Sequence, residues 1–236
     1  MHHPIPTTGR LSSRMSEADI AKLLARLQPH LPTAADWAHP EIELEIGMGN
    51  GLALLARAQA APHRLFVGSE LYLNGLQVAL NHLTPAPRSL GEGGNIRLTN
   101  HDARALLATI PPATLSRILI PFPDPWPKSG HHKRRIVQPS LLDEAARTLK
   151  PGGELWVVTD WPSYAYHTIA TLFPHPAFTL AQTGGQAADC KPSARLDEKL
   201  GPHHLATPPA WWVPTKYQAK AYTAGRVPWF IEATRK

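Results

Sequence analysis

The sequence predicts one α/β domain with a mostly parallel sheet, helices on both faces and an antiparallel C-terminal edge strand. Three observations lead to this prediction. Short apolar runs alternate with helical patterns five times between residues 41 and 173. Two more strand-like runs follow, and we expect them to pair as a hairpin at one sheet edge. Among 236 residues, 43% are hydrophobic and 18% are charged, which is typical of a globular chain with its own core.

The first forty residues differ from the rest. Residues 1–15 are polar and basic without a hydrophobic period, so we expect a mobile basic tail. Ser16 and Asp19 have the spacing of a helix capping box. Apolar residues then recur at helical spacing, at Ile20, Leu23, Leu24 and Leu27. We therefore divide the chain into a tail (1–15), an N-terminal helical extension (16–40) and the main domain (41–236).

The elements of the main domain follow from its apolar runs and its Pro and Gly residues. We expect strands over Glu41–Ile46, Leu65–Glu70, Asn95–Asn100, Arg117–Pro121 and Leu155–Thr159. We expect helices over Leu52–Ala61, Leu73–Leu83, Ala103–Ile110, Pro139–Leu149 and Tyr164–Phe173. The last two strands should be Ala177–Ala181 and Val227–Ala233, after loops over Thr84–Gly94 and Gln182–Pro209. Strands that alternate with helices pair in parallel, because each helix crosses back over the sheet.

Composition excludes several classes of protein. The one cysteine, Cys190, excludes an intramolecular disulfide and a cysteine-ligated zinc or iron–sulfur site, and it indicates a reducing cytoplasm. No metal site is expected. No run approaches the ~18 apolar residues of a membrane span, and the N-terminus lacks the apolar core of a secretory signal. The formal net charge of +6 fits a polyanionic partner.

A glycine-rich turn follows the first predicted strand. Gly47, Gly49 and Gly51 stand in a Gly-x-Gly-x-Gly spacing preceded by Glu45. Glycines at such a turn let the backbone approach a ligand and present N–H groups to it. The spacing resembles the S-adenosylmethionine-binding loop of Rossmann-like methyltransferases more than a dinucleotide fingerprint. Structural glycines in a tight turn are the alternative.

Acidic residues follow the next strands. Glu70 ends the second strand, where a carboxylate can accept hydrogen bonds from ribose hydroxyls. Asp102 follows the third strand, and its alternative role is to cap the helix that begins at Ala103. Ligands of open parallel sheets bind at the carboxyl ends of the strands. We therefore expect Glu45, Glu70, Asp102 and Asp124, which follows the fourth strand, to share one cleft.

The loop after the fourth strand carries the most specific pattern, Pro-Phe-Pro-Asp-Pro-Trp-Pro-Lys over residues 121–128. Its alternating prolines stiffen the backbone around Asp124 and Trp126. A basic run follows, with Lys128, Lys133, Arg134 and Arg135. We expect these cations, with Arg10 and Arg14 of the tail, to bind phosphate. A solvated loop is the alternative for the basic run alone.

This loop, together with His131–Arg135, closely resembles the signature of bacterial tRNA (guanine-N7)-methyltransferases, which are class I Rossmann-like enzymes. Further matches from residue 41 onward are Glu45–Gly51, Gly68–Glu70, Thr159–Trp161 and Thr215–Gln218. The resemblance implies methyl transfer from S-adenosylmethionine to N7 of a guanosine in the variable loop of tRNA.

The resemblance also implies roles for individual residues. The cofactor would be bound by Glu45, Gly47, Gly49, Gly51, Glu70, Asp102 and Asp124. Asp124 matches the catalytic position of the family. The tRNA would be contacted by Lys128, Asp160, Thr215, Lys216, Tyr217 and Gln218.

The implied chemistry suits these residues. Guanine N7 has a lone pair and no proton, so positioning is the main requirement. A carboxylate such as Asp124 can stabilise the positive charge that methylation places on the ring, or accept N–H bonds from the base. Trp126 or Trp161 can stack on a base, with core packing as the alternative for both.

Gln218 stands where the family usually has Glu, which removes a negative charge and adds a donor. We expect a weaker hold on the guanine, with Asp160 supplying the charge. The substitution leaves open a noncatalytic RNA-binding protein on a methyltransferase fold. A methyltransferase for another RNA base is a second alternative, although Cys190 lies in the wrong segment for a cytosine C5 enzyme. A nicotinamide-dependent oxidoreductase disagrees with the glycine spacing. Both a monomer and a homodimer are compatible with the sequence.

Overall fold

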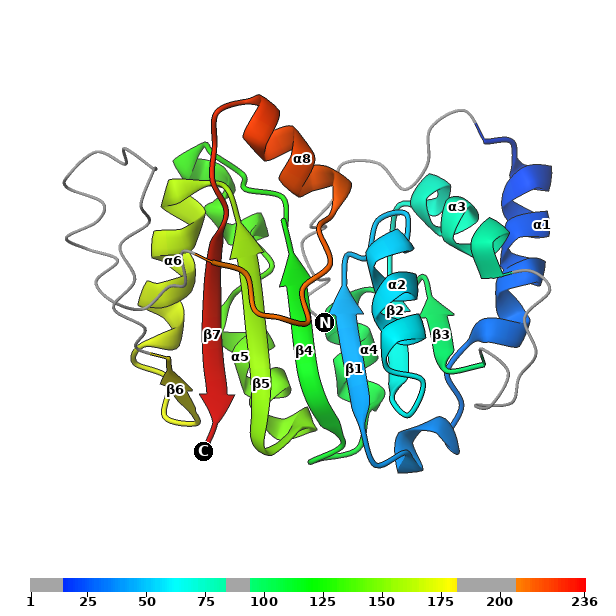
Figure 1. The fold of residues 1–236 in the computed structure, drawn as a ribbon, viewed down its shortest axis with the longest axis horizontal. Helices are drawn as coiled ribbons and strands as arrows, with labels where there is room; N and C mark the ends of the chain where they lie inside the picture. The colour runs from blue at the N-terminus through cyan, green and yellow to red at the C-terminus, as the bar shows by residue number, and fades with distance from the viewer. Residues whose placement is uncertain (1–14, 84–93, 182–206) are drawn as a thin grey trace.

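One sheet forms the centre of the computed structural model, which describes residues 15–83, 94–181 and 207–236 (Figure 1). Within these ranges the strand order is β3-β2-β1-β4-β5-β7-β6. The strands are β1 (Ile42–Ile46), β2 (Leu65–Ser69), β3 (Ile96–Thr99), β4 (Leu115–Pro121), β5 (Leu149–Thr159), β6 (Phe178–Leu180) and β7 (Trp229–Arg235). Strands β1 to β5 are parallel, whereas β7 is antiparallel to both β5 and β6. The predicted fold class is confirmed. The C-terminal strand itself lies one place inside the edge, because β6 covers its outer side.

Helices cover both faces of the sheet. They are α1 (Glu17–Leu27), α2 (Leu52–Ala60), α3 (Leu73–Leu83), α4 (Ala103–Thr109), α5 (Pro139–Thr148), α6 (Pro162–Leu172) and α8 (Lys216–Thr223). Short 3-10 helices lie at η1 (Gln28–His30), η2 (Asp36–Ala38) and η4 (Ser129–Arg134). In Figure 1, α2 lies in front of β1 and β2, α4 and α5 lie behind the sheet, and α8 lies near the upper ends of the parallel strands.

Two apolar clusters account for most of the core. The larger one joins the sheet to α4, α5 and α6, with Leu44 and Val157 fully buried. The second joins α2, α3 and α1 to the other face of the sheet, and it includes Leu23 and Leu27. Burying a leucine side chain contributes roughly 1.5–3 kcal/mol to the free energy of folding. The burial of Leu23 and Leu27 therefore anchors α1 to this cluster. The predicted capping box at Ser16 is present. The predicted domain boundary at residue 41 stays a prediction. Helix α1 precedes this boundary in the chain but packs into the core of the main domain.

Two elements differ from the prediction. Strand β5 begins at Leu149, directly after α5, where we expected a turn before Leu155. The pairing of β5 with β4 shifts register between Leu115 and Arg117. Gly152, in the first part of β5, has a φ of 77°. Helix α8 was not predicted. Among its eight residues only Gln218 and Ala221 are buried, which leaves little hydrophobic period to detect.

Some predictions fall on residues that the structure does not describe: Arg10, Arg14, Cys190, and most of the loops expected at Thr84–Gly94 and Gln182–Pro209. Of the helices in the described ranges, none combines the length and the apolar character that crossing a membrane would require.

Candidate functional site

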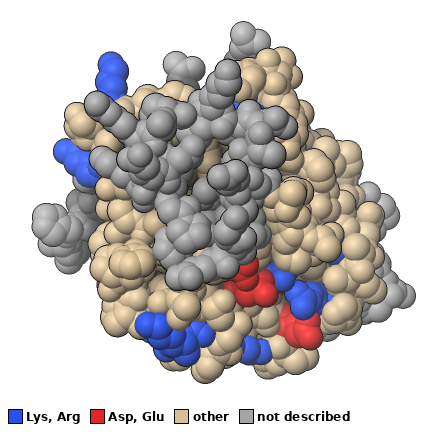
Figure 2. Space-filling view, turned by 60° about the vertical axis from the view of Figure 1, so that its left-hand side comes forward, with Lys and Arg blue, Asp and Glu red and all other residues tan. Residues whose placement is uncertain are grey.

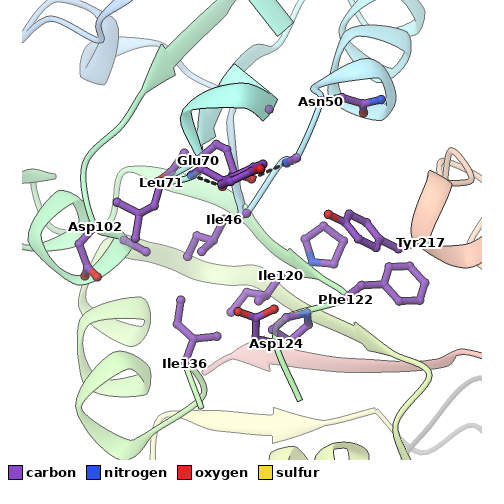
Figure 3. A pocket seen from close by; sticks show the side chains of 18 of the residues that line it. Ile46, Asn50, Glu70, Leu71, Asp102, Ile120, Phe122, Asp124, Ile136 and Tyr217 are labelled. Carbon is purple, nitrogen blue, oxygen red and sulfur yellow. Dashed lines mark hydrogen bonds between the residues drawn. The ribbon is translucent and has the colours of Figure 1, made fainter. Parts of the chain in front are cut away.

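A pocket of about 500 Å³ lies at the carboxyl ends of the parallel strands (Figure 3). Its walls come from the glycine turn after β1, the residues after β2 and β3, the loop after β4, and the start of α8. This is the edge where parallel sheets bind ligands.

The glycine turn between β1 and α2 requires its glycines. Gly47, Gly49 and Gly51 have φ values of 76°, 60° and 71°, in the left-handed region that other residues avoid. Gly47 and Gly49 line the pocket. A Cβ on Gly51 would come within 2.8 Å of Ala79 on α3, so the third glycine allows the turn and α3 to pack closely. The turn therefore combines the ligand-facing and the structural roles.

Glu70 is fixed by the backbone around it. Its Oε2 accepts from the Gly49 N–H at 2.7 Å, and its Oε1 accepts from the Tyr72 N–H at 2.7 Å (Figure 3). Each carboxylate oxygen keeps a further lone pair for a ligand. Burial raises the pKa of Glu70, and the two N–H donors and the charge of Lys216 oppose this only in part.

Asp102 lies at the opposite end of the pocket from Tyr217 (Figure 3). Its Oδ1 accepts from the Arg104 N–H at 2.9 Å and so caps α4. The two readings of this residue are compatible, because the capping carboxylate also faces the pocket. Leu71 and Ile136 lie near it and give this end apolar walls.

The loop around Asp124 has a strained backbone. Phe122 and Trp126, neither of them glycine, have φ values of 50° and 41°. Such conformations cost on the order of 1–3 kcal/mol each and persist where surrounding contacts enforce them. Asp124, between these two residues, lines the pocket (Figure 3). Burial by the surrounding protein raises the pKa of Asp124.

Arg135 supplies those contacts, which corrects our expectation that it binds phosphate. Its side chain is 2% exposed. Nε donates to the Pro125 carbonyl at 3.1 Å, and Nη1 and Nη2 donate to the carbonyl and hydroxyl of Ser163 at 3.0 and 3.1 Å. The guanidinium also lies 5.2 Å from the ring centroid of Tyr164. Arg135 therefore ties the Asp124 loop to α6 and is closed to RNA.

The other basic residues of this run differ from Arg135. Lys133 is exposed, and Arg134 lines the pocket with its guanidinium 4.9 Å from the ring centroid of Trp126. On the face shown in Figure 2, Lys and Arg side chains of the described residues stand in separate groups rather than one stripe. Trp126 lines the pocket, whereas Trp161 packs against the larger core cluster.

Glu45 is not in the main pocket. Glu43 and Glu45 alternate with the core residues of β1, so they project to the other face of the strand. There Arg57 pairs with Glu45 and, at 2.8 Å, with Glu43. Glu45 is 1% exposed and lines a smaller cavity of about 120 Å³ that also borders Gly47. The expectation that four acidic residues share one cleft therefore holds for Glu70, Asp102 and Asp124.

Of residues 215–218, which were expected to bind tRNA, only some face the main pocket. Thr215 caps α8 by accepting from the Gln218 N–H at 3.2 Å. Lys216 and Tyr217 line both cavities. The Tyr217 ring is stacked on that of Phe122, with centroids 6.4 Å apart. Burial raises the pKa of Tyr217, and Glu70 and Asp124 add to the effect.

Gln218 points away from the pocket and is 4% exposed. Its Oε1 accepts from Trp212 Nε1 at 2.7 Å, and its Nε2 donates to the Tyr222 hydroxyl at 2.9 Å. A direct contact with guanine, as expected from the sequence, disagrees with this position. On a helix, residue 218 faces a different side from residues 216 and 217, and this side packs on the body of the protein.

Lys128 and Asp160 lie outside both cavities. Lys128 is exposed, and Asp160 accepts from Arg226 Nε at 2.7 Å. The sequence did not indicate that Phe122 and Arg134 face the pocket. The alternating prolines around Phe122 were the available signal for its unusual backbone, whereas nothing in the basic run distinguishes Arg134 from its neighbours.

Comparison with known proteins gives the class of the protein. A family model described as "putative methyltransferase" matches residues 40–230. The pocket fits the cofactor of such enzymes, since Glu70 has free lone pairs and a Cβ on Gly47 would meet nothing within 4 Å. The matched family model places the chain among the methyltransferases.

Relatives define the family more closely. The chain is 38% identical over 233 residues to a tRNA (guanine-N(7)-)-methyltransferase of Azorhizobium caulinodans, covering 96% of this chain and 92% of that one. It is 35% identical over 212 residues to the enzyme of the same name from Caulobacter sp., covering 85% and 92%. The chain belongs to the tRNA (guanine-N7)-methyltransferase family. The structural alignment with the 16S rRNA methyltransferase KamB covers 95% of each chain at 13% sequence identity, with a TM-score of 0.49.

Proposed function

We propose that the protein transfers a methyl group from S-adenosylmethionine to N7 of a guanosine in the variable loop of tRNA. The observation that carries this proposal is the position of Asp124. A strained, proline-rich loop holds this carboxyl in the same pocket as Glu70 and Asp102, in a chain that belongs to this family.

The pocket has suitable groups for each part of the cofactor. Glu70 accepts hydrogen bonds from the ribose hydroxyls with the lone pairs that Gly49 and Tyr72 leave free. Asp102 would border the adenine, and the apolar side chains of Leu71 and Ile136 line the same end of the pocket. Gly47 and Gly49 let the backbone approach the rest of the molecule.

The cofactor supplies an electrophilic methyl group on a positively charged sulfur. The lone pair of guanine N7 would form a bond to the methyl carbon as the bond from that carbon to sulfur breaks, with S-adenosylhomocysteine as the leaving group, so the protein needs no strong base. Asp124 orients the guanine by accepting from its N–H groups, and its negative charge stabilises the charge that develops on the ring. Trp126, backed by Arg134, offers a surface on which the base can stack.

The tRNA contacts remain part of this proposal. Lys128 and Lys133 are exposed beside the Asp124 loop, where they can reach phosphates. Asp160, held by Arg226, directly follows the carboxyl end of β5, and the segment Thr215–Tyr217 lines the smaller cavity. We propose tRNA as the partner, a cytoplasmic location, and a monomer or homodimer, which light scattering after size-exclusion chromatography distinguishes.

Incubation of the purified protein with S-adenosylmethionine and unmodified tRNA tests the proposal, followed by mass spectrometry of the nucleosides. We expect 7-methylguanosine, located in the variable loop by mass spectrometry of ribonuclease fragments of the same tRNA, and a rate of its formation at least about 100-fold lower with Asp124→Asn. A different methylated nucleoside would support the alternative of another RNA base. Binding of tRNA without any methylation would support a noncatalytic RNA-binding protein. Gln218 lends that alternative little support, because its side chain faces the protein interior rather than the pocket.

A further inference from the structure

Two cations line the two cavities among the described residues, Lys216 and Arg134. The main pocket also carries the carboxyl groups of Glu70, Asp102 and Asp124. S-adenosylmethionine has an amino-acid tail with one carboxylate and one ammonium group. A carboxylate placed among three acidic side chains would be repelled, so the tail needs a position with a cation close by.

The smaller cavity offers both signs of charge. Its walls include Glu45, held by Arg57, together with Lys216. It borders Gly47 and Asn50 of the glycine turn, which also line the main pocket, so the two cavities adjoin at that turn. A ligand whose ribose is held at Glu70 can therefore extend its tail past the glycine turn into this cavity.

We propose that Lys216 binds the carboxylate of this amino-acid tail, while Glu45 faces its ammonium group. The inference rests on the proposed function, because it takes S-adenosylmethionine as the ligand. It assigns Lys216 to the cofactor, whereas the resemblance to the family assigned its segment to tRNA.

The position of Lys216 supports this assignment. Its Cε lies 4.0 Å from the place that a Cβ on Gly49 would take, so the side chain lies over the glycine turn. Thr215 caps the first turn of α8, and the bonds of Gln218 to Trp212 and Tyr222 hold the helix in place. Lys216 therefore starts from a fixed backbone. Arg134 is less suited to the tail, because it lines the main pocket with its three acidic side chains and does not line the smaller cavity.

Two ligands that differ only in the tail test the proposal. S-adenosylhomocysteine keeps the amino-acid tail, whereas 5′-methylthioadenosine lacks both of its charged groups. We expect Lys216→Met to raise the Kd of S-adenosylhomocysteine about tenfold and to leave that of methylthioadenosine unchanged. Lys216→Arg should restore part of the affinity. Both constants are measured by calorimetry, directly or by competition.

Lys220 provides the matched control. It lies one turn along α8 and outside both cavities, with its Nζ 5.6 Å from the ring centroid of Tyr217. Lys220→Met should change neither constant. Thermal unfolding of each variant shows whether the fold is intact.

Three results would overturn the proposal. An unchanged Kd for S-adenosylhomocysteine in Lys216→Met would mean that Lys216 does not bind the tail. Equal weakening of both ligands would place its effect at the adenosine or in the shape of the pocket. An effect on tRNA affinity alone would return Lys216 to the role that the resemblance implies. Failure of the unmodified protein to bind S-adenosylhomocysteine would instead contradict the proposed function itself.

Discussion

The two halves of the pocket are built by different means. On the side of β1, β2 and β3, the glycine turn, Glu70 and Asp102 are fixed mostly by backbone groups nearby in the sheet or helix. On the side of β4, side chains hold the Asp124 loop and α8, through the bonds of Arg135 to Ser163 and of Trp212 to Gln218. Bonds to the backbone thus fix the first half of the pocket, and bonds and packing between side chains fix much of the second.

The largest expected effect concerns the second half. Asp124→Ala should lower the turnover number at least about 100-fold, as expected when a preorganised charged group is removed from a transition state. Labelled cofactor and one tRNA substrate measure this loss. Because the side chain is exposed in the pocket, the unfolding temperature should stay unchanged. Turnover close to that of the unmodified protein would contradict the assignment of Asp124.

Removing the anchor of the same loop should affect stability. Arg135→Ala leaves the Pro125 and Ser163 carbonyls without their donor, which should lower the free energy of unfolding by about 2–4 kcal/mol. Urea denaturation measures the difference. Lys133→Ala, an exposed neighbour, should leave stability unchanged and weaken tRNA binding. Equal effects of both variants on stability and on tRNA binding would contradict the distinction between a structural Arg135 and an RNA-binding Lys133.

The bond between Gln218 and Trp212 should contribute to the stability of the second half. Gln218→Leu leaves the Trp212 N–H unpaired in the interior, at a cost of about 1–3 kcal/mol. Tyr222→Phe removes only the outer bond of the same side chain and should cost less. Chemical denaturation ranks the two variants. A neutral Gln218→Leu would mean that α8 is held without this network.

The smallest effect is expected in the first half and depends on pH. Burial raises the pKa of Glu70 above the ordinary 4.5, so this carboxyl takes up its proton at a higher pH than a free one. The ionised form accepts bonds from the ribose, so acidification should weaken cofactor binding already above pH 4.5. Calorimetry with S-adenosylhomocysteine follows this change. Glu70→Gln should bind less well at neutral pH and lose the dependence.

The first half of the site was predictable from the sequence, because parallel strands end at one edge and their following residues meet there. Glu70 and Asp102 were found in this way. Glu45 was misplaced because it belongs to the strand rather than to its end, so alternation along β1 decides its direction.

In the second half, the family resemblance identified the residues, but the positions of several side chains could not be predicted from the sequence. The resemblance located Asp124, yet the burial of Arg135 depends on α6, and the orientation of Gln218 depends on a short helix with little hydrophobic period. The bond of Arg135 to Ser163 joins residues 28 positions apart, which no local pattern encodes. The partners of Gln218 lie close in the chain, but the short helix gives no signal for the direction in which its side chain points.

The position of β7 between β5 and β6 has a consequence for the order in which the protein can fold during synthesis. Among the described strands, β6 pairs only with β7, which the ribosome makes later. Until β7 emerges, the outer side of β5 is an open edge, and open edges attract other chains. Because α8 directly precedes β7, the wall of the pocket and the closure of the sheet become available together. A nascent chain is therefore most exposed to aggregation just before it can gain its activity.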